Sequence, residues 1–195
     1  MKRHFFVAAT LSLALTNATA ANETGKTKAD SVKTVALQEV QVLSTRAGET
    51  TPITHTDISK SQIKSMNYGK DVPFILSLTP SVTTTSDAGN GIGYTSIRVR
   101  GTDPTRINIT ANGIPINDAE SSNVYWTNMP DFASSVESMQ IQRGVGTSTN
   151  GAGAFGATIN MQTENIGVKP FGGIDLSAGS YGSHKETFRF GTGLI

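Results

Sequence analysis

Two runs of alternating apolar and polar residues flank a glycine-rich segment within residues 136–163. Such alternation has the period of a half-buried strand, so it predicts one strand before the glycines and one after them. The thirteen residues between the runs, 144–156, contain five glycines: Gly144, Gly146, Gly151, Gly153 and Gly156. Each glycine costs backbone entropy unless a left-handed turn or a close contact requires it. We therefore expect a strand, a tight loop and a second strand.

The last three of these glycines also satisfy G-x-G-x-x-G, the pattern of dinucleotide-binding proteins. That pattern requires a helix immediately afterwards, because the helix N-terminus holds the phosphates. Here the glycines are followed by residues 157–163, which alternate with period two and predict a strand. The glycines thus indicate tight packing and not a nucleotide site.

The first twenty residues have the pattern of an export signal. Lys2, Arg3 and His4 form a basic start, residues 5–15 are largely apolar, and residues 18–20 offer a cleavage site of small residues. The apolar run is shorter than the roughly 20 residues of a membrane-spanning helix. A buried N-terminal helix is the alternative. The sequence contains no cysteine, which excludes disulfides and a lipid anchor on an N-terminal cysteine.

Composition and motifs give no indication of catalysis. The net charge of +1 does not favour nucleic acid as a partner. The three histidines are isolated from one another and from carboxylate clusters, so no metal site is expected. No G-x-S-x-G motif presents a nucleophile. We expect a protein that is not an enzyme and that has no cofactor.

Residues 21–36 are polar and lack hydrophobic periodicity, which predicts a flexible tether. A short β-prone segment follows at residues 37–46, with Val40 and Val42 on one side and Gln41 on the other. Such a segment on a tether suits strand addition to the sheet edge of another protein. The alternative is that it forms the first edge strand of the following domain.

An α+β domain is predicted for residues 50–164. Its first half should contain a strand at 52–54, a helix capped by Thr56 or Asp57 and ending near Met66, a second helix capped by Asp71, and strands at 82–85 and 97–100. Val72, Ile75, Leu76 and Leu78 would form the buried face of the second helix.

Residues 106–116 consist of two alternating runs around Asn112-Gly113, which predicts a hairpin with Pro115 at a sheet edge. A short helical turn is expected at 130–135. Between them, residues 117–128 are polar except for Val124, Tyr125 and Trp126. These aromatic residues either contact a ligand from the loop or fold back to cover the sheet.

After the domain, residues 171–195 alternate again. Ile174, Leu176, Phe188 and Phe190 lie on one face, with polar residues and glycine between them. An apolar face towards lipid and a polar face towards the interior are typical of strands in a membrane β-barrel. The sequence predicts two such strands, joined by a turn at residues 180–185.

Five segments in this order resemble the plug domain of TonB-dependent outer-membrane receptors. They are LQEVQV at 37–42, IRVRG at 97–101, ANGIPI at 111–116, VE at 136–137 with RG at 143–144, and GAFGATIN at 153–160. The resemblance implies a receptor in the Gram-negative outer membrane, in contact with its lipid, whose barrel is closed by the plug. Energy would come from the inner membrane through TonB.

The resemblance also implies residue roles. The TonB box would be Leu37, Gln38, Glu39, Val40, Gln41, Val42, Leu43, Ser44 and Thr45; Gln41 departs from the apolar residue that is usual in the family. Arg100, Arg143 and Glu137 would contact the barrel, the arginines by pairing with carboxylates of its wall. Asn123, Tyr125 and Trp126 are candidates to face the ligand.

Only two barrel strands are predicted, although a complete barrel of this family needs several hundred further residues. We therefore expect a fragment: the plug and first hairpin of an importer of a scarce ligand, with a ferric siderophore favoured over cobalamin or a glycan. The alternative is a soluble periplasmic plug that binds TonB without a barrel. The lipid-facing pattern favours the importer.

Overall fold

A computed structural model describes residues 46–147, 150 and 153–193. All of them lie in the second of two units into which the chain divides, Gln41–Ile195. The predicted signal, the tether and TonB box residues 37–45 lie outside the described residues. Among the described residues, no helix is long and apolar enough to cross a membrane.

The secondary-structure elements are short; α marks an α-helix, η a 3₁₀ helix and β a strand. In chain order they are β1 (His55–Ser59), α1 (Lys60–Met66), α2 (Val72–Ile75), η1 (Leu76–Leu78), β2 (Val82–Ser86), β3 (Thr95–Val99), η2 (Pro104–Arg106), β4 (Ile107–Ala111), β5 (Ile114–Pro115), η3 (Trp126–Asn128), η4 (Phe132–Ser135), β6 (Val136–Arg143), β7 (Ala157–Thr163), β8 (Phe171–Ala178), η6 (Ser180–Gly182) and β9 (His184–Gly191).

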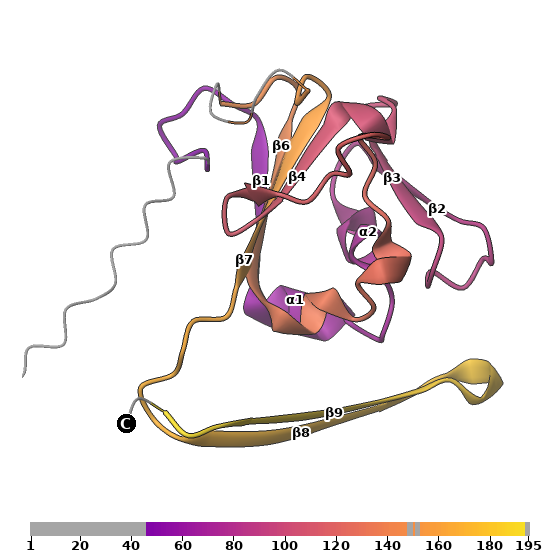
Figure 1. The fold of residues 1–195 in the computed structure, drawn as a ribbon, viewed down its shortest axis with the longest axis vertical. Coiled ribbons are helices and arrows are strands. Elements are labelled where there is room, and N and C mark those ends of the chain that lie inside the picture. Colours follow the sequence, from indigo (N-terminus) through magenta and orange to yellow (C-terminus); the bar gives the residue numbers. More distant parts are fainter. Residues whose placement is uncertain (1–45, 148–149, 151–152, 194–195) are drawn as a thin grey trace, which may run out of the picture. The chain divides into compact units, whose positions relative to one another are not determined.

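Five strands form a mixed sheet in the order β1, β6, β7, β4, β5 (Figure 1). The two runs beside the glycines are β6 and β7, which pair antiparallel, whereas β4 pairs parallel to β7. The two predicted strands are thus confirmed; part of the glycine loop, residues 148–149 and 151–152, lies outside the described residues. The hairpin around Asn112-Gly113 is also confirmed, and Pro115 lies in edge strand β5. Strands β2 and β3 form a separate two-stranded sheet.

The hydrophobic core lies on one face of the five-stranded sheet. Ile141 and Ile159 are opposite each other in β6 and β7 and are fully buried. Ile63 of α1, Ile75 of α2 and Leu76 of η1 belong to the same buried cluster. Because apolar and polar residues alternate along both strands, the apolar side chains lie on this face and the polar ones on the other.

The other face of the sheet is polar and is also buried. The exposed fractions of its side chains are 2% for Gln140, 0% for Gln142, 0% for Thr158 and 3% for Asn160. Buried polar groups are stable only when they have hydrogen-bond partners. Gln142 donates to Gln140 Oε1 at 2.9 Å and Thr110 Oγ1 donates to Asn160 Oδ1 at 2.6 Å, whereas Thr158 Oγ1 has no partner among the described residues. The alternation by itself does not predict that this polar face is buried.

Several predicted boundaries are wrong. Residues 52–54 do not form a strand; β1 begins at His55, so Thr56 and Asp57 lie in a strand and do not cap α1. The helix begins after Ser59, whose backbone N–H donates to the Gln62 side chain at 2.9 Å. This is half of a capping box, a stronger start signal than a single threonine or aspartate.

The second helix begins after Asp71, as predicted, with Pro73 in its first turn. The Asp71 carboxylate does not cap it and instead accepts a hydrogen bond from Thr95 Oγ1 at 2.8 Å. The prediction of a buried Leu78 is wrong, because this side chain is 82% exposed. The α-helix gives way to a 3₁₀ turn at Leu76, which changes the direction in which the following side chains point.

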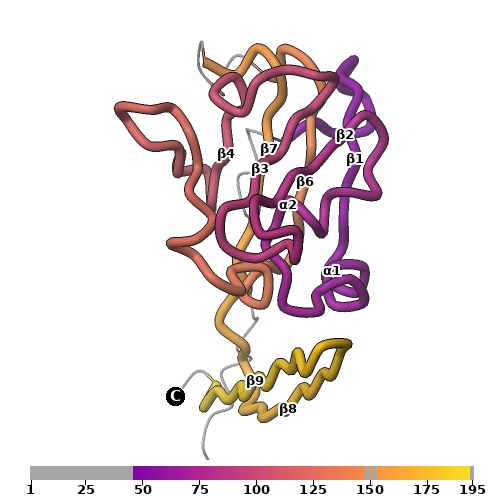
Figure 2. The backbone as a smooth tube through the Cα atoms, turned by 90° about the vertical axis from the view of Figure 1, so that its right-hand side faces the viewer, coloured from indigo at the N-terminus to yellow at the C-terminus, as the bar shows by residue number. Residues whose placement is uncertain are grey.

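The β8–β9 hairpin follows the sheet, and Figures 1 and 2 show α1 between the end of the sheet and this hairpin. Its strands pair antiparallel from Phe171 opposite Gly191 to Ala178 opposite His184. The turn is shorter than predicted, because β9 already begins at His184. Lys185 is consequently a strand residue, which decides the direction of its side chain.

Candidate functional site

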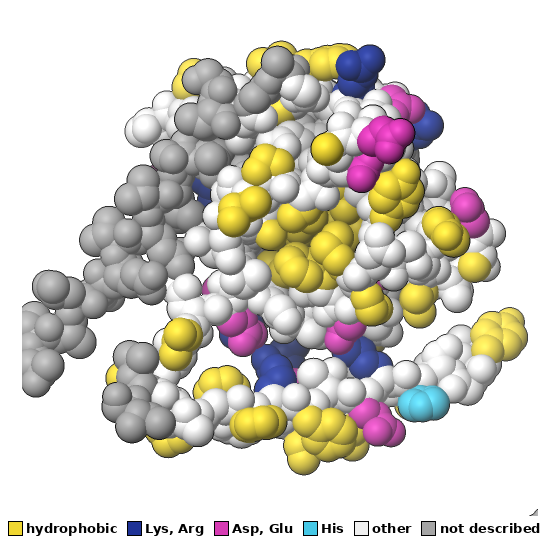
Figure 3. Space-filling model, viewed as in Figure 1, with side chains coloured by type: hydrophobic (Ala, Val, Ile, Leu, Met, Phe, Trp, Pro, Cys, Tyr) yellow, Lys and Arg dark blue, Asp and Glu magenta, His cyan; other side chains and the backbone are white. Residues whose placement is uncertain are grey.

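The two faces of the β8–β9 hairpin differ in polarity. Ile174, Leu176, Phe188 and Phe190 are 65%, 71%, 66% and 87% exposed. Figure 3 shows hydrophobic side chains along the side of the hairpin that points away from the α+β domain, and charged side chains between the hairpin and that domain. The predicted alternation is confirmed, and it directs the polar face of the hairpin towards α1.

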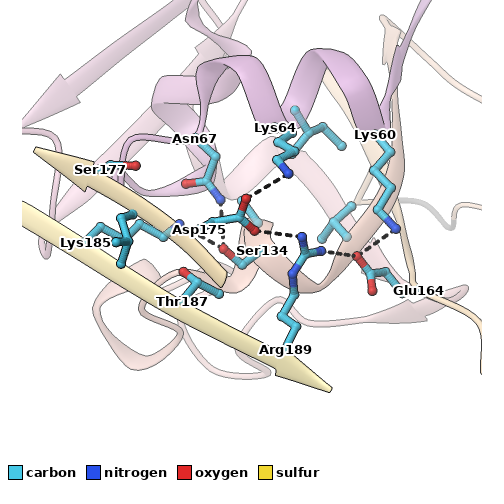
Figure 4. Close-up of a pocket in the computed structure, with 14 residues that line it drawn as sticks. Lys60, Lys64, Asn67, Ser134, Glu164, Asp175, Ser177, Lys185, Thr187 and Arg189 are labelled. Atoms are coloured by element: carbon cyan, nitrogen blue, oxygen red, sulfur yellow. Dashed lines mark hydrogen bonds and ion pairs between the residues drawn. The ribbon is translucent and has the colours of Figure 1, made fainter. Parts of the chain in front are cut away.

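Ion pairs join α1 to the hairpin along what we call the charged seam, formed by Lys60, Lys64, Asp131, Glu137, Glu164, Asp175, Lys185 and Arg189. Lys60 and Lys64 are four residues apart and so share one face of α1. Lys64 Nζ lies 2.8 Å from Asp175 Oδ1 in β8, and Arg189 Nη2 of β9 lies 2.7 Å from Asp175 Oδ2 (Figure 4). Asp175 thereby connects α1 with both strands of the hairpin.

The seam continues past Arg189 to the end of the sheet. Arg189 Nη1 lies 3.4 Å from Glu164 Oε1, and Lys60 Nζ lies 2.9 Å from the same atom. Lys60 also contacts Glu137 Oε2 of β6 at 2.9 Å. Cations and carboxylates alternate along this line, so each charge has an opposite neighbour.

At the other end of the seam, Lys185 of β9 reaches into a polar socket. Its Nζ lies 2.6 Å from Asp131 Oδ1 and 2.9 Å from Ser134 Oγ. Asn67 Nδ2 donates to the same two groups, at 3.3 and 3.0 Å. The stem of Lys185 runs beside Gly69, which adopts φ of +86°. The lysine side chain is only 15% exposed, which makes this the least solvated ion pair of the seam.

The seam shifts two pKa values. The hydrogen bonds that Lys60 donates to Glu137 and Glu164 raise its pKa, and the hydrogen bonds that Asp175 accepts from Lys64 and Arg189 lower the pKa of Asp175. Both shifts favour the charged forms of these groups. At neutral pH Lys60 and Asp175 are therefore charged.

A cavity of about 260 Å³ lies within the seam, between α1 and the hairpin. Charged and hydroxyl side chains line it together with a few apolar ones such as Ile63 and Leu176. The described residues contain no group of three or more side chains that could hold a metal ion. The geometry joins α1 and the loop before β6 to the hairpin through ion pairs.

The arginines predicted to contact a barrel lie at one end of the sheet. Arg143 donates to Thr56 Oγ1 at 2.8 Å and to the carbonyl oxygen of His55 at 3.3 Å, so it ties β6 to β1. Arg100 is exposed at a turn after β3 with φ of +52°, a strained conformation for a residue with a side chain. Within the described part of the chain, neither arginine has an acidic partner.

Of the predicted ligand-facing residues, Trp126 is the most buried. Its side chain is 3% exposed and belongs to the hydrophobic core, so the aromatic residue covers the sheet. Tyr125 is 45% exposed. Asn123, Tyr125 and Trp126 all line a cavity of about 220 Å³, together with Asp87 and Tyr94. The structure thus brings the loop next to the tip of the β2–β3 sheet.

The charged seam was not predicted as a site. A signal was present, since Asp175 and Arg189 occupy the polar positions of the predicted strands. Their partners Lys60, Asp131 and Glu164 carry no such signal, because isolated surface charges in a sequence do not indicate which other charges they meet.

Solved structures share this fold. The chain is similar to FpvAI in its complex with pyocin S2 (TM-score 0.60, 19% identity, 74% of this chain and 19% of that chain). It is similar to Pseudomonas aeruginosa FpvA bound to heterologous pyoverdines (TM-score 0.58, 19% identity, 72% and 18%) and to the ferric yersiniabactin uptake receptor FyuA from Yersinia pestis (TM-score 0.53, 20% identity, 71% and 21%). At these identities the likeness concerns the fold.

The chain spans about a fifth of the length of each of these structures. A search of curated protein sequences found no match. The model of the TonB-dependent receptor plug domain matches residues 47–158, which is more than half of the chain and spans β1 to β6 and the start of β7. The chain therefore belongs to the TonB-dependent receptor plug domain family.

Proposed function

We propose that this chain is the plug and first barrel hairpin of an outer-membrane receptor that imports a scarce ligand with energy from TonB. The observation that carries the proposal is the two-sided hairpin. Its polar face is occupied by ion pairs with the plug, while four large apolar side chains on the other face are 65–87% exposed. A lipid-facing role explains the apolar face, because a soluble protein gains nothing from exposing it.

The same observation speaks against the alternative, a soluble periplasmic plug that binds TonB without transport. Sequencing the coding DNA beyond the codon for Ile195 distinguishes the two. A continuing frame with many further alternating strands supports the importer. A stop codon directly after Ile195 supports the soluble module.

We propose a ferric siderophore as the ligand. Similar folds occur in FpvA bound to pyoverdines and in a ferric yersiniabactin uptake receptor, which supports this choice. A copper transporter, OprC, also has a similar fold (TM-score 0.50), so the ligand depends on side chains more than on the plug fold. Cobalamin and glycans are the ligands to compare in a binding assay.

Asn123 and Tyr125 are our candidates for ligand contact from the plug. The exposed Tyr125 ring lies beside a cavity whose other polar groups include Asp87 and Asn123. An aromatic ring with a hydroxyl offers both apolar contact and a hydrogen bond to a ligand. In the complete receptor, Tyr125→Ala should weaken ligand binding while the fold is retained. Unchanged affinity would remove Tyr125 from the candidates.

TonB is the proposed partner of residues 37–45, through strand addition. Main-chain hydrogen bonds give most of the affinity in this mode, so the polar Gln41 weakens pairing without abolishing it. The test is recovery of the chain on an immobilised C-terminal domain of TonB. Deleting residues 37–45 should abolish recovery, and deleting nine residues of the tether, 24–32, should not. Equal recovery of all three proteins would contradict the proposed partner.

Arg100 is the plug residue that we propose to pair with a carboxylate of the barrel wall. It is exposed and has no acidic partner among the described residues, and a guanidinium enclosed by a barrel needs one. Arg143 and Glu137 already have partners within the plug, at 2.8 Å in Thr56 and 2.9 Å in Lys60. Contacts of these two residues with the barrel would be additional to the contacts described above.

A further inference from the structure

The first two described residues are fixed to the buried polar face of the sheet. Arg46 donates to Ser138 Oγ at 2.9 Å, to the Ser138 carbonyl oxygen at 3.0 Å and to the Asn160 carbonyl oxygen at 3.1 Å. Ala47 is 5% exposed, and both of its backbone groups bond to the side chain of Gln140. These contacts join the start of the domain to β6 and β7, which are inner strands of the sheet.

The side chain of Gln140 bonds to both backbone groups of Ala47, as the backbone of a neighbouring strand would. Its Oε1 accepts from the Ala47 N–H at 2.8 Å and its Nε2 donates to the Ala47 carbonyl oxygen at 2.9 Å. The second amide proton goes to Asp57 Oδ1 at 2.8 Å, and Oε1 also accepts from Gln142 Nε2 at 2.9 Å. A carboxamide has two donors and room for two acceptor bonds, so every position of Gln140 is used.

Burial makes these bonds costly to break. Gln140 is 2% exposed, so release of Ala47 would leave one donor and one acceptor position of its amide unpaired in a protein interior. Burial also lowers the pKa of Arg46, with Asp57 acting in the opposite direction. A half-buried guanidinium without its three oxygen acceptors would likewise lack compensation for its desolvation.

The next part of the chain has no comparable anchor. Residues 48–53 bond to one another, with Thr51 N–H to the Gly48 carbonyl oxygen at 2.9 Å and Ile53 N–H to the Thr51 carbonyl oxygen at 2.7 Å. Pairing with β6 starts only at Thr54, whose carbonyl oxygen accepts from the Arg143 N–H at 2.9 Å. Tension applied upstream of Arg46 therefore reaches Arg46 and Ala47 first and edge strand β1 second.

We infer that Arg46 and Gln140 are positioning residues for energy coupling: they clamp the chain directly after the TonB-binding segment to the inner strands β6 and β7. A pull on residues 37–45 must release this clamp before it can peel β1 from the sheet. The inference rests on the proposed function, because it assigns the pull to TonB. The clamp itself rests only on the described contacts.

Mechanical unfolding of the chain tests the clamp. The chain has no cysteine, so one handle can be attached at Gln41→Cys and the other at Ile114→Cys, an exposed position of β5. When the protein with both handles is pulled, the first unfolding step should lengthen the chain by about 25 Å, because release of the clamp frees the seven residues 48–54 before β1, at about 3.5 Å each. Gln140→Met and Arg46→Ala should both lower the force of this step, and Arg98→Ala should leave it unchanged.

Moving the first handle to Glu49→Cys, an exposed position beyond the clamp, provides the matched control. From that position Arg46→Ala, which removes bonds to Ser138 and Asn160 and none to β1, should leave the force of the first step unchanged, whereas a general loss of stability would lower it from both positions. An effect of equal size from both handles would overturn the inference. The inference would also be overturned if, without further substitutions, the clamp and β1 were released together, so that no separate step of about 25 Å appeared.

Amide hydrogen exchange supplies a second measurement that needs no handles and no TonB. Gln140→Met should speed exchange of the Ala47 N–H about tenfold, because its only acceptor is lost. Exchange in the core strand at Ile159 should stay slow, which also shows that the variant is folded. Unchanged protection at Ala47 would overturn the clamp. Equal TonB recovery with and without residues 37–45 would instead contradict the proposed function and would leave these two results as they are.

Discussion

Replacing Lys185 by methionine removes the charge from the polar socket but keeps the apolar stem beside Gly69. The ammonium group lies 2.6 Å from Asp131 Oδ1, and the side chains of the pair are 15% and 36% exposed. Exposed ion pairs contribute about 0.2–1 kcal/mol, and removing one partner of a buried pair costs about 3–5 kcal/mol. Because Lys185 is mostly buried and Asp131 lies at the limit between half-buried and exposed, we expect the free energy of unfolding to fall by about 2 kcal/mol.

This loss should appear in urea unfolding followed by the fluorescence of Trp126, the only tryptophan, whose side chain is 3% exposed. For a chain of this size it corresponds to a decrease of about 4–8 °C in Tm. Asp131→Asn and the double variant complete a cycle, in which we expect a coupling energy of about 1 kcal/mol. Lys169→Met, at an exposed lysine, is the control and should stay within about 0.5 kcal/mol of the parent.

A coupling energy below about 0.3 kcal/mol would refute the reasoning, because it would mean that the pair adds nothing to the attachment of the hairpin. A loss from Lys185→Met no greater than that from Lys169→Met would have the same meaning. Lys185→Ala separates the two contributions of the side chain. Any loss beyond that of the methionine variant measures the packing of the stem beside Gly69.

Three further predictions concern pH, packing and the tryptophan. The pKa of Asp175 is lowered in the folded chain, so its ion pairs stabilise the hairpin fully at pH values above the ordinary pKa of 3.8 and are lost as the pH falls through the lower, folded pKa. Titration of the carboxyl group followed by NMR should show that Lys64→Met raises the pKa of Asp175 back towards the ordinary value. Gly156→Ala should lower the free energy of unfolding in urea by about 1–3 kcal/mol, because the new Cβ would lie 2.9 Å from the Arg106 carbonyl oxygen. Gly153→Ala, with open space around it, should be nearly neutral. Equal losses in the two variants would show that the crowding at Gly156 is relieved. Trp126→Ala should destabilise the plug by about 3–5 kcal/mol, as removal of a core aromatic does, and a variant of undiminished Tm would contradict its place in the core.

Local signals in the sequence account for the parts of the fold that were predicted. The period of two marked β6, β7, β8 and β9, and Asn112-Gly113 marked the turn of the β4–β5 hairpin. Helix starts were less reliable: Asp71 precedes α2 as predicted, whereas the predicted caps Thr56 and Asp57 lie in β1 and α1 begins after Ser59. The pairing of β1 with β6 places Thr56 and Asp57 in a strand.

The sequence by itself determined the strands β6, β7, β8 and β9, that the hairpin has one apolar and one polar face, and that residues 151–156 do not precede a helix. These properties depend on neighbouring residues, whose side chains alternate with the backbone. Tertiary structure decided the parallel pairing of β4 with β7, the burial of Gln140 on a polar face, the partners of Lys185 and Asp175, and the place of Trp126 in the core. Each of these depends on which distant residues come into contact, and the strength of an ion pair or a buried amide depends on the solvent that those contacts exclude.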